Sequence, residues 1–265
     1  MGSCLVSGGP RWTLITGASS GIGLELARLF ARDGDGLLLV ARRRERLDRL
    51  AAELSAAHAV PVRVLALDLA VPGATQLLYD WTMEQGLVVH TLVNNAGFGL
   101  RGAFHELSVA RQDEMVRLNI GAPTSLARLF LPGMIERRDG GILNVASMAA
   151  WQAGPYMAVY YATKAYLLSL SEALHEEAKE YGVKVSALCP GPVKTEFIEI
   201  AGLEGRPRFD SAPDAAWVAA EGYAAYRANR AIHIPGSLNR LGILAERLVP
   251  RSVPRRAVKK LNGSD

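Results

Sequence analysis

The chain has 265 residues, 49% of them hydrophobic and 21% charged, which is typical of a soluble globular protein that buries one large core. No apolar run reaches the roughly 18 to 20 residues that cross a bilayer, and the first ten residues lack signal-peptide features, so we expect a cytoplasmic location. Cys4 and Cys189 have neither a CxxC nor a zinc spacing, so we expect no metal site and no disulfide framework.

The first predicted elements are a strand, a glycine turn and a helix. They follow a flexible leader over residues 1–10, in "WTLITGASSGIGLELARLF". Small residues in this position let backbone N–H groups approach a pyrophosphate, and the helix N-terminus favours an anion. A tight turn without a ligand is the alternative. The residues predicted to bind a dinucleotide are Gly17, Ser19, Ser20, Gly21, Ile22 and Gly23.

The second predicted strand ends in "LLLVARRRERL". Folds that select NAD tend to have an acidic residue here for the ribose 2′-hydroxyl, whereas this chain has Ala41, Arg42 and Arg43. Cations at a helix start oppose the helix dipole, and a nearby anion would offset that cost. We predict that Arg42 or Arg43 holds a 2′-phosphate, so that the cofactor is NADP(H). The alternative is a solvated face whose arginines pair with Glu45 and Asp48.

Two further strands also end in polar residues. Asp68 and Leu69 close "VRVLALDL"; the Asp68 carboxylate could accept from an adenine amino group or cap the following turn. Asn95, Ala96 and Gly97 follow the strand in "TLVNNAG", at the edge where open α/β sheets bind ligands. Uninterrupted apolar strands alternating with amphipathic segments predict one doubly wound, Rossmann-type α/β domain, a parallel sheet of about seven strands, over residues 11–236.

The reacting groups are predicted on a strand end and a helix. Ser147 ends "GILNVAS", and "VYYATKAYLLSL" places Tyr160 and Lys164 four residues apart on one helical face, with Tyr161 turned away to pack. A phenol has a pKa of about 10, and a nearby ammonium should lower it towards neutrality. Tyr160 is then the general acid/base, tuned by Lys164, while the Ser147 hydroxyl bonds the substrate oxygen.

A substrate pocket is expected between these groups and a mobile flap at about residues 192–215. Trp151 and Tyr156 lie between Ser147 and Tyr160, and Phe197 lies in the flap. With Ser147 and Tyr160 they form the predicted substrate site, although core packing is an equal alternative for the first two. Their apolar character favours an apolar substrate.

The last segment, residues 237–265, is predicted to be a basic amphipathic extension. From Gly236 on, seven basic residues stand against two acidic ones, whereas the net charge of the whole chain is +4. Leu238, Leu241, Leu244 and Leu248 fall near one helical face. The extension could cover the substrate cleft, extend an oligomer contact or rest on an anionic membrane, in that order. No motif for nucleic-acid binding is present.

The motifs together resemble short-chain dehydrogenases/reductases. "TGASSGIG", "NNAG", "RLNIGAP", Ser147, Tyr160-x-x-x-Lys164 and "PGPVKT" occur in the order of that family, over residues 11 to about 240. The resemblance implies a catalytic tetrad of Asn119, Ser147, Tyr160 and Lys164, with the lysine also on the nicotinamide ribose. It implies that Pro190, Gly191, Val193 and Thr195 border the nicotinamide, and that the chain forms a homodimer or homotetramer. Thr163 replaces the serine that many members have before the lysine.

We therefore expect an NADP(H)-dependent ketone reductase or secondary alcohol dehydrogenase acting on a small apolar substrate. Reduction of a 3-ketoacyl thioester is the alternative within the enzyme class, although the C-terminal extension departs from ketoacyl carrier-protein reductases. The alternative of another class is a non-catalytic NADP-binding sensor or scaffold.

Overall fold

The computed structural model describes residues 9–206, 211–246 and 248–263. Most of the predicted leader, Cys4 and part of the predicted flap lie outside these residues. A central parallel sheet orders its strands β3-β2-β1-β4-β5-β6-β7. The strands are β1 Trp12–Thr16, β2 Gly36–Ala41, β3 Val62–Ala66, β4 Val89–Asn94, β5 Gly141–Val145, β6 Lys184–Leu188 and β7 Ile232–His233. The prediction of a doubly wound sheet is confirmed.

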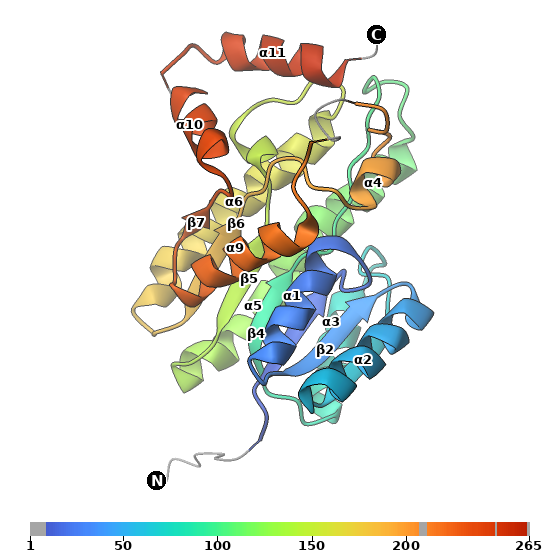
Figure 1. The fold of residues 1–265 in the computed structure, drawn as a ribbon, viewed down its shortest axis with the longest axis vertical. Coiled ribbons are helices and arrows are strands. Elements are labelled where there is room, and N and C mark those ends of the chain that lie inside the picture. The colour runs from blue at the N-terminus through green and yellow to red at the C-terminus, as the bar shows by residue number, and fades with distance from the viewer. Residues whose placement is uncertain (1–8, 207–210, 247, 264–265) are drawn as a thin grey trace.

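Helices cover both faces of the sheet (Figure 1). They are α1 Gly21–Arg32, α2 Arg44–His58, α3 Ala74–Glu84, α4 Val109–Val116, α5 Ala122–Arg137, α6 Ala158–Lys179, α7 Phe197–Ile200, α9 Ala215–Arg227, α10 Ser237–Glu246 and α11 Ser252–Asn262. One turn of π-helix, η1 Arg117–Gly121, joins α4 to α5, and a 3₁₀ turn, η2 Met148–Trp151, precedes α6. Within the described residues, no helix is both long enough and apolar enough to span a bilayer.

The core consists of one apolar layer on each side of the sheet. On one face Leu26 of α1, Leu47 of α2 and Val218 of α9 pack on the strands. On the other face Leu78 of α3 and Leu126 of α5 do the same. Because both faces are covered, β1 is buried at all five positions, which explains why its sequence, WTLIT, has no charged residue.

The chain order of the strands creates the crevice that holds the site. The connections from β1 and from β4 run to opposite sides of the sheet, so the turns after these two neighbouring strands diverge at the carboxyl edge. The two C-terminal helices, α10 and α11, lie together at the end of the molecule opposite α2 (Figure 1).

Candidate active site

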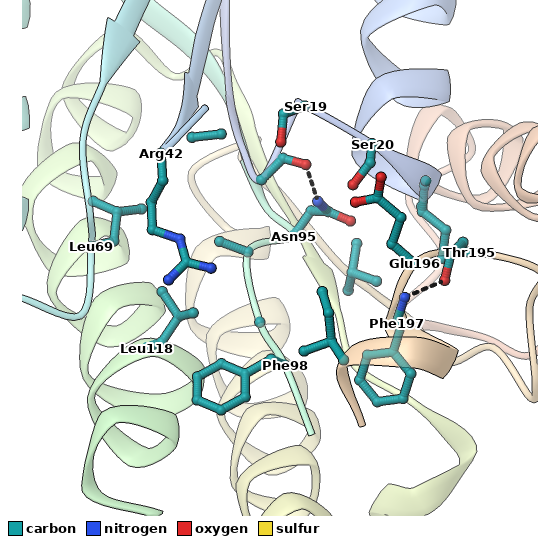
Figure 2. A pocket seen from close by; sticks show the side chains of 18 of the residues that line it. Ser19, Ser20, Arg42, Leu69, Asn95, Phe98, Leu118, Thr195, Glu196 and Phe197 are labelled. Carbon is teal, nitrogen blue, oxygen red and sulfur yellow. Dashed lines mark hydrogen bonds between the residues drawn. The ribbon is translucent and has the colours of Figure 1, made fainter. Parts of the chain in front are cut away.

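One pocket of about 300 Å³ lies at the carboxyl edge of the sheet. Figure 2 shows Arg42 and Leu69 on one side of it, Thr195 and Glu196 on the other, and Phe98 and Phe197 near one end. All the predicted cofactor residues except Gly23 line it: Gly17, Ser19, Ser20, Gly21, Ile22, Arg42, Arg43, Asp68, Leu69, Asn95, Ala96, Gly97, Tyr160, Lys164, Pro190, Gly191, Val193 and Thr195.

The turn needs glycine for two reasons, backbone conformation and close packing. Gly17 and Gly21 have φ angles of +67° and +57°, which favour glycine. Gly23 instead permits close packing, since a Cβ there would lie 2.6 Å from the Gly17 carbonyl oxygen. The Asn95 side-chain amide donates to the carbonyls of Thr16 and Gly17, at 2.9 and 3.1 Å, and so ties the end of β4 to the turn. The turn therefore leaves its main chain facing the pocket.

The two arginines after β2 have different surroundings. The Arg43 guanidinium donates to the hydroxyls of Ser19 and Ser20, at 3.1 and 3.0 Å, beside the glycine turn. Arg42 forms looser ion pairs with Asp68 and Glu114, at 3.9 and 3.8 Å. Asp68 accepts a hydrogen bond from the Ala70 N–H, so it caps a turn as well as lining the pocket. Arg43 is thus the cation better placed to bind an anion together with hydroxyl groups.

Tyr160 and Lys164 lie on the pocket side of α6. The Lys164 ammonium is buried, donates to the Val145 carbonyl at 2.8 Å and lies 5.9 Å from the centre of the Tyr160 ring. Tyr161 is turned away and buried among Met157, Ala149 and Val258. Helical geometry therefore separates the two tyrosines into one that lines the pocket and one that packs in the interior.

The pKa values of this pair move away from the sequence expectation. Burial raises the pKa of Tyr160 to about 12, and the hydrogen bond with the Ser147 hydroxyl only partly opposes this. Burial also lowers the pKa of Lys164 to about 8. The lysine therefore does not lower the pKa of the tyrosine as expected, because desolvation of the buried phenol dominates. Tyr160 is therefore a protonated phenol at neutral pH, the form needed to donate a proton.

Asn119 lies in the π-helical turn, which turns its side chain inward. Its amide donates to the Phe98 carbonyl at 2.9 Å and to the Thr163 hydroxyl at 3.1 Å, and its oxygen accepts from the Phe98 N–H. The Thr163 hydroxyl in turn donates to the Tyr160 carbonyl. A Cβ on Gly97 would lie 3.0 Å from Asn119 Oδ1 and 3.7 Å from Lys164 Nζ, so Gly97 packs between them. The threonine that replaces serine here connects Asn119 to the helix of Tyr160.

The predicted substrate residues separate into two groups. Ser147 follows β5, and its hydroxyl accepts from the Ala149 N–H at 3.1 Å beside Tyr160. Phe197 lines the pocket, with its ring centre 5.2 Å from that of Tyr160. Trp151 packs instead against an apolar cluster that includes Leu167 and Cys189, and the Tyr156 ring lies near Gly263, just beyond α11. Of the predicted substrate residues, Tyr160 and Phe197 line the pocket, whereas Ser147, Trp151 and Tyr156 do not; Ser147 lies next to the pocket through its hydrogen bond with Tyr160.

Sequence reasoning did not assign several side chains that line the pocket, among them Phe98, Arg111, Leu118 and Glu196. Phe98 directly follows the "NNAG" motif, and Glu196 directly precedes Phe197, so both adjoin predicted residues. Arg111, whose guanidinium lies 4.7 Å from the centre of the Phe98 ring, and Leu118 carry no sequence signal, because the fold alone brings α4 and η1 to the pocket.

The helix α11 packs beside the site, on residues next to the pocket. Asn262, fully buried at the end of α11, donates to the Pro155 carbonyl at 3.1 Å and to the Tyr161 hydroxyl at 3.4 Å. Arg101 and Arg206 donate to carbonyls at the same helix end. Val258 packs in one apolar cluster with Tyr161, Ala201 and Leu203. The helix α11 therefore lies over the flap and α6.

These residues suit a dinucleotide: main-chain groups of a glycine turn and an arginine at one end of the pocket, a phenol and an ammonium at the other. Among the described residues, no cluster of three or more His, Cys, Asp or Glu could hold a metal ion.

Comparison with known proteins gives consistent relatives. The family model described as "short chain dehydrogenase" matches residues 11–202. A very-long-chain 3-oxoacyl-CoA reductase of Anas platyrhynchos is 33% identical over 205 residues, covering 75% of this chain and 64% of the relative. The chain therefore spans less than two thirds of the length of this curated relative.

Two solved structures cover nearly the whole fold. A short-chain dehydrogenase from Sphingobium yanoikuyae in complex with NADPH has a TM-score of 0.82 at 31% identity, with 90% of this chain and 93% of that chain covered. The bulky-bulky ketone specific alcohol dehydrogenase from Comamonas testosteroni has a TM-score of 0.77 at 29% identity, with 91% of this chain and 99% of that chain covered.

Proposed function

This chain belongs to the short-chain dehydrogenase/reductase family of oxidoreductases, and we propose that it uses NADP(H) to interconvert an apolar ketone and its secondary alcohol. One observation carries the proposal: a single pocket joins the glycine turn and Arg43 to Tyr160 and Lys164. A binding protein without chemistry would not need a buried lysine beside a tyrosine at the end of its nucleotide pocket.

The residues divide the work of the reaction between them. When bound in the pocket, NADPH would supply the hydride for the carbonyl carbon. The neutral Tyr160 hydroxyl donates its proton to the carbonyl oxygen, which the Ser147 hydroxyl orients by a hydrogen bond. Lys164 places positive charge beside the phenol when the proton leaves, so it stabilises the phenolate that forms. Asn119, held by Phe98 and Thr163, fixes the wall of the pocket next to Lys164.

We assign the preference for NADP(H) to Arg43, supported by its hydrogen bonds to Ser19 and Ser20 at the glycine turn. Kinetics with NADPH and NADH test this assignment. Arg43→Ala should raise KM for NADPH by about tenfold or more and leave KM for NADH nearly unchanged, since loss of a charge-assisted contact costs about 1.5–3 kcal/mol. Arg44→Ala, at an exposed neighbour paired with Asp48, is the matched control. A wild-type preference for NADH would refute the assignment.

A 3-oxoacyl thioester is the second candidate substrate. The similar curated proteins are very-long-chain 3-oxoacyl-CoA reductases, and they support this class more than a small apolar ketone. The similar alcohol dehydrogenase from Comamonas testosteroni, which is specific for bulky-bulky ketones, supports a bulky ketone instead. Following NADPH absorbance with bulky ketones, short ketones and 3-oxoacyl-CoA of several chain lengths decides between them. The substrate with the highest kcat/KM identifies the class, and the absence of turnover with all of them would contradict both candidates.

The helices α10 and α11 form an outer surface that we propose rests on an anionic lipid bilayer. Its apolar part is Leu238, Leu241, Leu244 and Leu248, with Leu238 and Leu248 both 82% exposed. Its basic part, on or beside α11, includes the exposed Arg255, Arg256, Lys259 and Lys260. Two copies of this basic surface would repel each other, whereas anionic lipid headgroups would attract it. We also propose that the enzyme is cytoplasmic and forms a homo-oligomer. Cell fractionation tests the location, and light scattering tests the oligomeric state.

A further inference from the structure

The Glu196 carboxylate connects the flap, which we expect to border the substrate, to the arginines after β2, which we expect to bind the cofactor. It belongs to the flap, between Thr195 and Phe197, and it lines the pocket. Its Oε1 accepts a hydrogen bond from the Arg46 guanidinium, and its Oε2 lies 2.7 Å from Arg43 Nη1. An anionic group of the substrate flap is thus bound to the arginine assigned to the 2′-phosphate.

The contact with Arg43 is a close ion pair. Glu196 Oε2 is buried and lies 2.7 Å from Arg43 Nη1, so charge attraction holds this oxygen. Burial raises the pKa of Glu196, but hydrogen bonds and charge from Arg46 and Arg43 outweigh it and leave the pKa below its usual range. The group is therefore an anion at neutral pH, and it is already partly withdrawn from water.

A 2′-phosphate and this carboxylate would compete for the same cation. Arg43 directs its other nitrogens to the hydroxyls of Ser19 and Ser20, which leaves Nη1 facing Glu196. Two anions on one guanidinium repel each other, so one of them must yield. A phosphate brings more charge and more acceptor oxygens than a carboxylate, which favours the phosphate.

A movement of Glu196 would also move the adjacent Phe197, whose ring packs on Tyr160. The Phe197 ring lies 5.2 Å from the Tyr160 ring, and a Cβ on Gly99 would lie 2.9 Å from it, so the ring is packed between Tyr160 and Gly99. The main chain of α7 connects the two side chains directly.

We propose that Glu196 is a specificity-determining residue that binds Arg43 when no cofactor is bound and is displaced from Arg43 by the 2′-phosphate of NADP(H), which leaves the flap held by Arg46 alone and so loosens it. NAD(H), which has no 2′-phosphate, leaves the Glu196 contact intact. The inference rests on the proposed NADP(H) preference, and it adds a link between the choice of cofactor and the opening of the substrate side of the pocket.

Binding measurements with Glu196→Gln test the competition. The variant should bind NADP⁺ about two- to fivefold more tightly than wild type, the range that a partly exposed ion pair supplies, and should bind NAD⁺ as wild type does. Glu199→Gln is the matched control, because Glu199 lies on the same short helix and is exposed. Unchanged or weaker NADP⁺ binding in Glu196→Gln would overturn the inference.

Hydrogen exchange of the flap separates this inference from the cofactor assignment. In wild type, 2′,5′-ADP should speed exchange over residues 195–203 and 5′-ADP should not, whereas in Glu196→Gln the flap should exchange fast with either probe. If wild type prefers NAD⁺ to NADP⁺, the proposed cofactor fails. If wild type prefers NADP⁺ but the two probes act alike on the flap, the cofactor assignment stands and the role of Glu196 is refuted.

Discussion

At the scale of single residues, burial decides the protonation of Tyr160 and Lys164. The lysine loses solvation and gains one carbonyl partner, Val145, so its pKa falls to about 8, while the pKa of the phenol rises to about 12. Both shifts disfavour charge. The Lys164 ammonium and the Ser147 hydroxyl are the polar groups beside the phenol that stabilise the phenolate when the proton leaves.

This burial predicts a pH dependence of stability. The unfolded chain keeps the Lys164 proton up to about pH 10.5, whereas the folded protein releases it near pH 8. Between these values the unfolded state binds more protons, so the free energy of unfolding should rise with pH. Compared with Lys164→Met, wild type should gain up to about 2 kcal/mol between pH 8 and pH 10. Denaturant unfolding of both proteins across this range measures the difference.

The exposed Lys179 at the end of the same helix provides the control. Lys179→Met should follow the wild-type pH profile. Above pH 10 the raised pKa of Tyr160 acts in the opposite sense, since the folded state then keeps a proton that the unfolded state loses. Parallel profiles of wild type and Lys164→Met from pH 8 to pH 10 would show that the lysine pKa is not lowered.

At the scale of elements, hydrogen bonds from the side chain of its last residue, Asn262, hold the end of α11 in place. Asn262 is fully buried and donates to Pro155 and Tyr161, so Asn262→Ala should leave buried acceptors unpaired at a cost of about 1–2 kcal/mol. Hydrogen exchange over residues 252–262 should then speed up by about five- to thirtyfold. Because α11 packs on the flap cluster, KM for the carbonyl substrate should rise while KM for NADPH stays unchanged.

Lys260→Ala, on the exposed side of α11, is the matched control for this change. It should leave both the exchange and the KM values at wild-type levels. If Asn262→Ala exchanges no faster than Lys260→Ala, the helix end is not held by this side chain.

The elements that could be predicted from the sequence are the strands and the glycine turn, which depend on residues close together in the chain. Seven apolar runs correspond to seven strands, and the glycine turn follows the first of them, because uninterrupted apolar strands and a glycine turn are readable within a few residues. The positions of Trp151 and Tyr156 were not predictable, since the cluster around Cys189 that Trp151 packs on, and Gly263 beside Tyr156, lie far away in the sequence. The contact between Arg43 and Glu196 spans the same kind of distance and was missed for the same reason.

At the scale of the whole molecule, the helices α10 and α11 lie at one end (Figure 1), and their exposed side chains include leucines and basic residues. Vesicle co-sedimentation tests the proposed lipid contact. Wild type should bind vesicles of phosphatidylcholine with phosphatidylglycerol, and pure phosphatidylcholine vesicles much less. Replacing Leu241, Leu244 and Leu248 with serine should weaken binding by about tenfold or more, because each leucine contributes apolar burial.

The matched control replaces Leu77 and Met83, exposed apolar residues of α3, with serine. These changes should leave lipid binding unchanged. If the triple variant binds vesicles as wild type does, the lipid contact is refuted. A smaller oligomer of the triple variant in light scattering, with unchanged lipid binding, would instead identify the surface as a contact between copies.

The central claim is that Tyr160, and not its neighbour, transfers the proton in an NADPH-dependent reduction. Single-turnover and steady-state kinetics of Tyr160→Phe and Tyr161→Phe, with NADPH affinity measured in parallel, test it most directly. Tyr160→Phe should lose about 10²–10⁴-fold in kcat and keep its affinity for NADPH, whereas Tyr161→Phe should lose little of either. If Tyr160→Phe turns over at the wild-type rate, or Tyr161→Phe is the inactive variant, the account is contradicted.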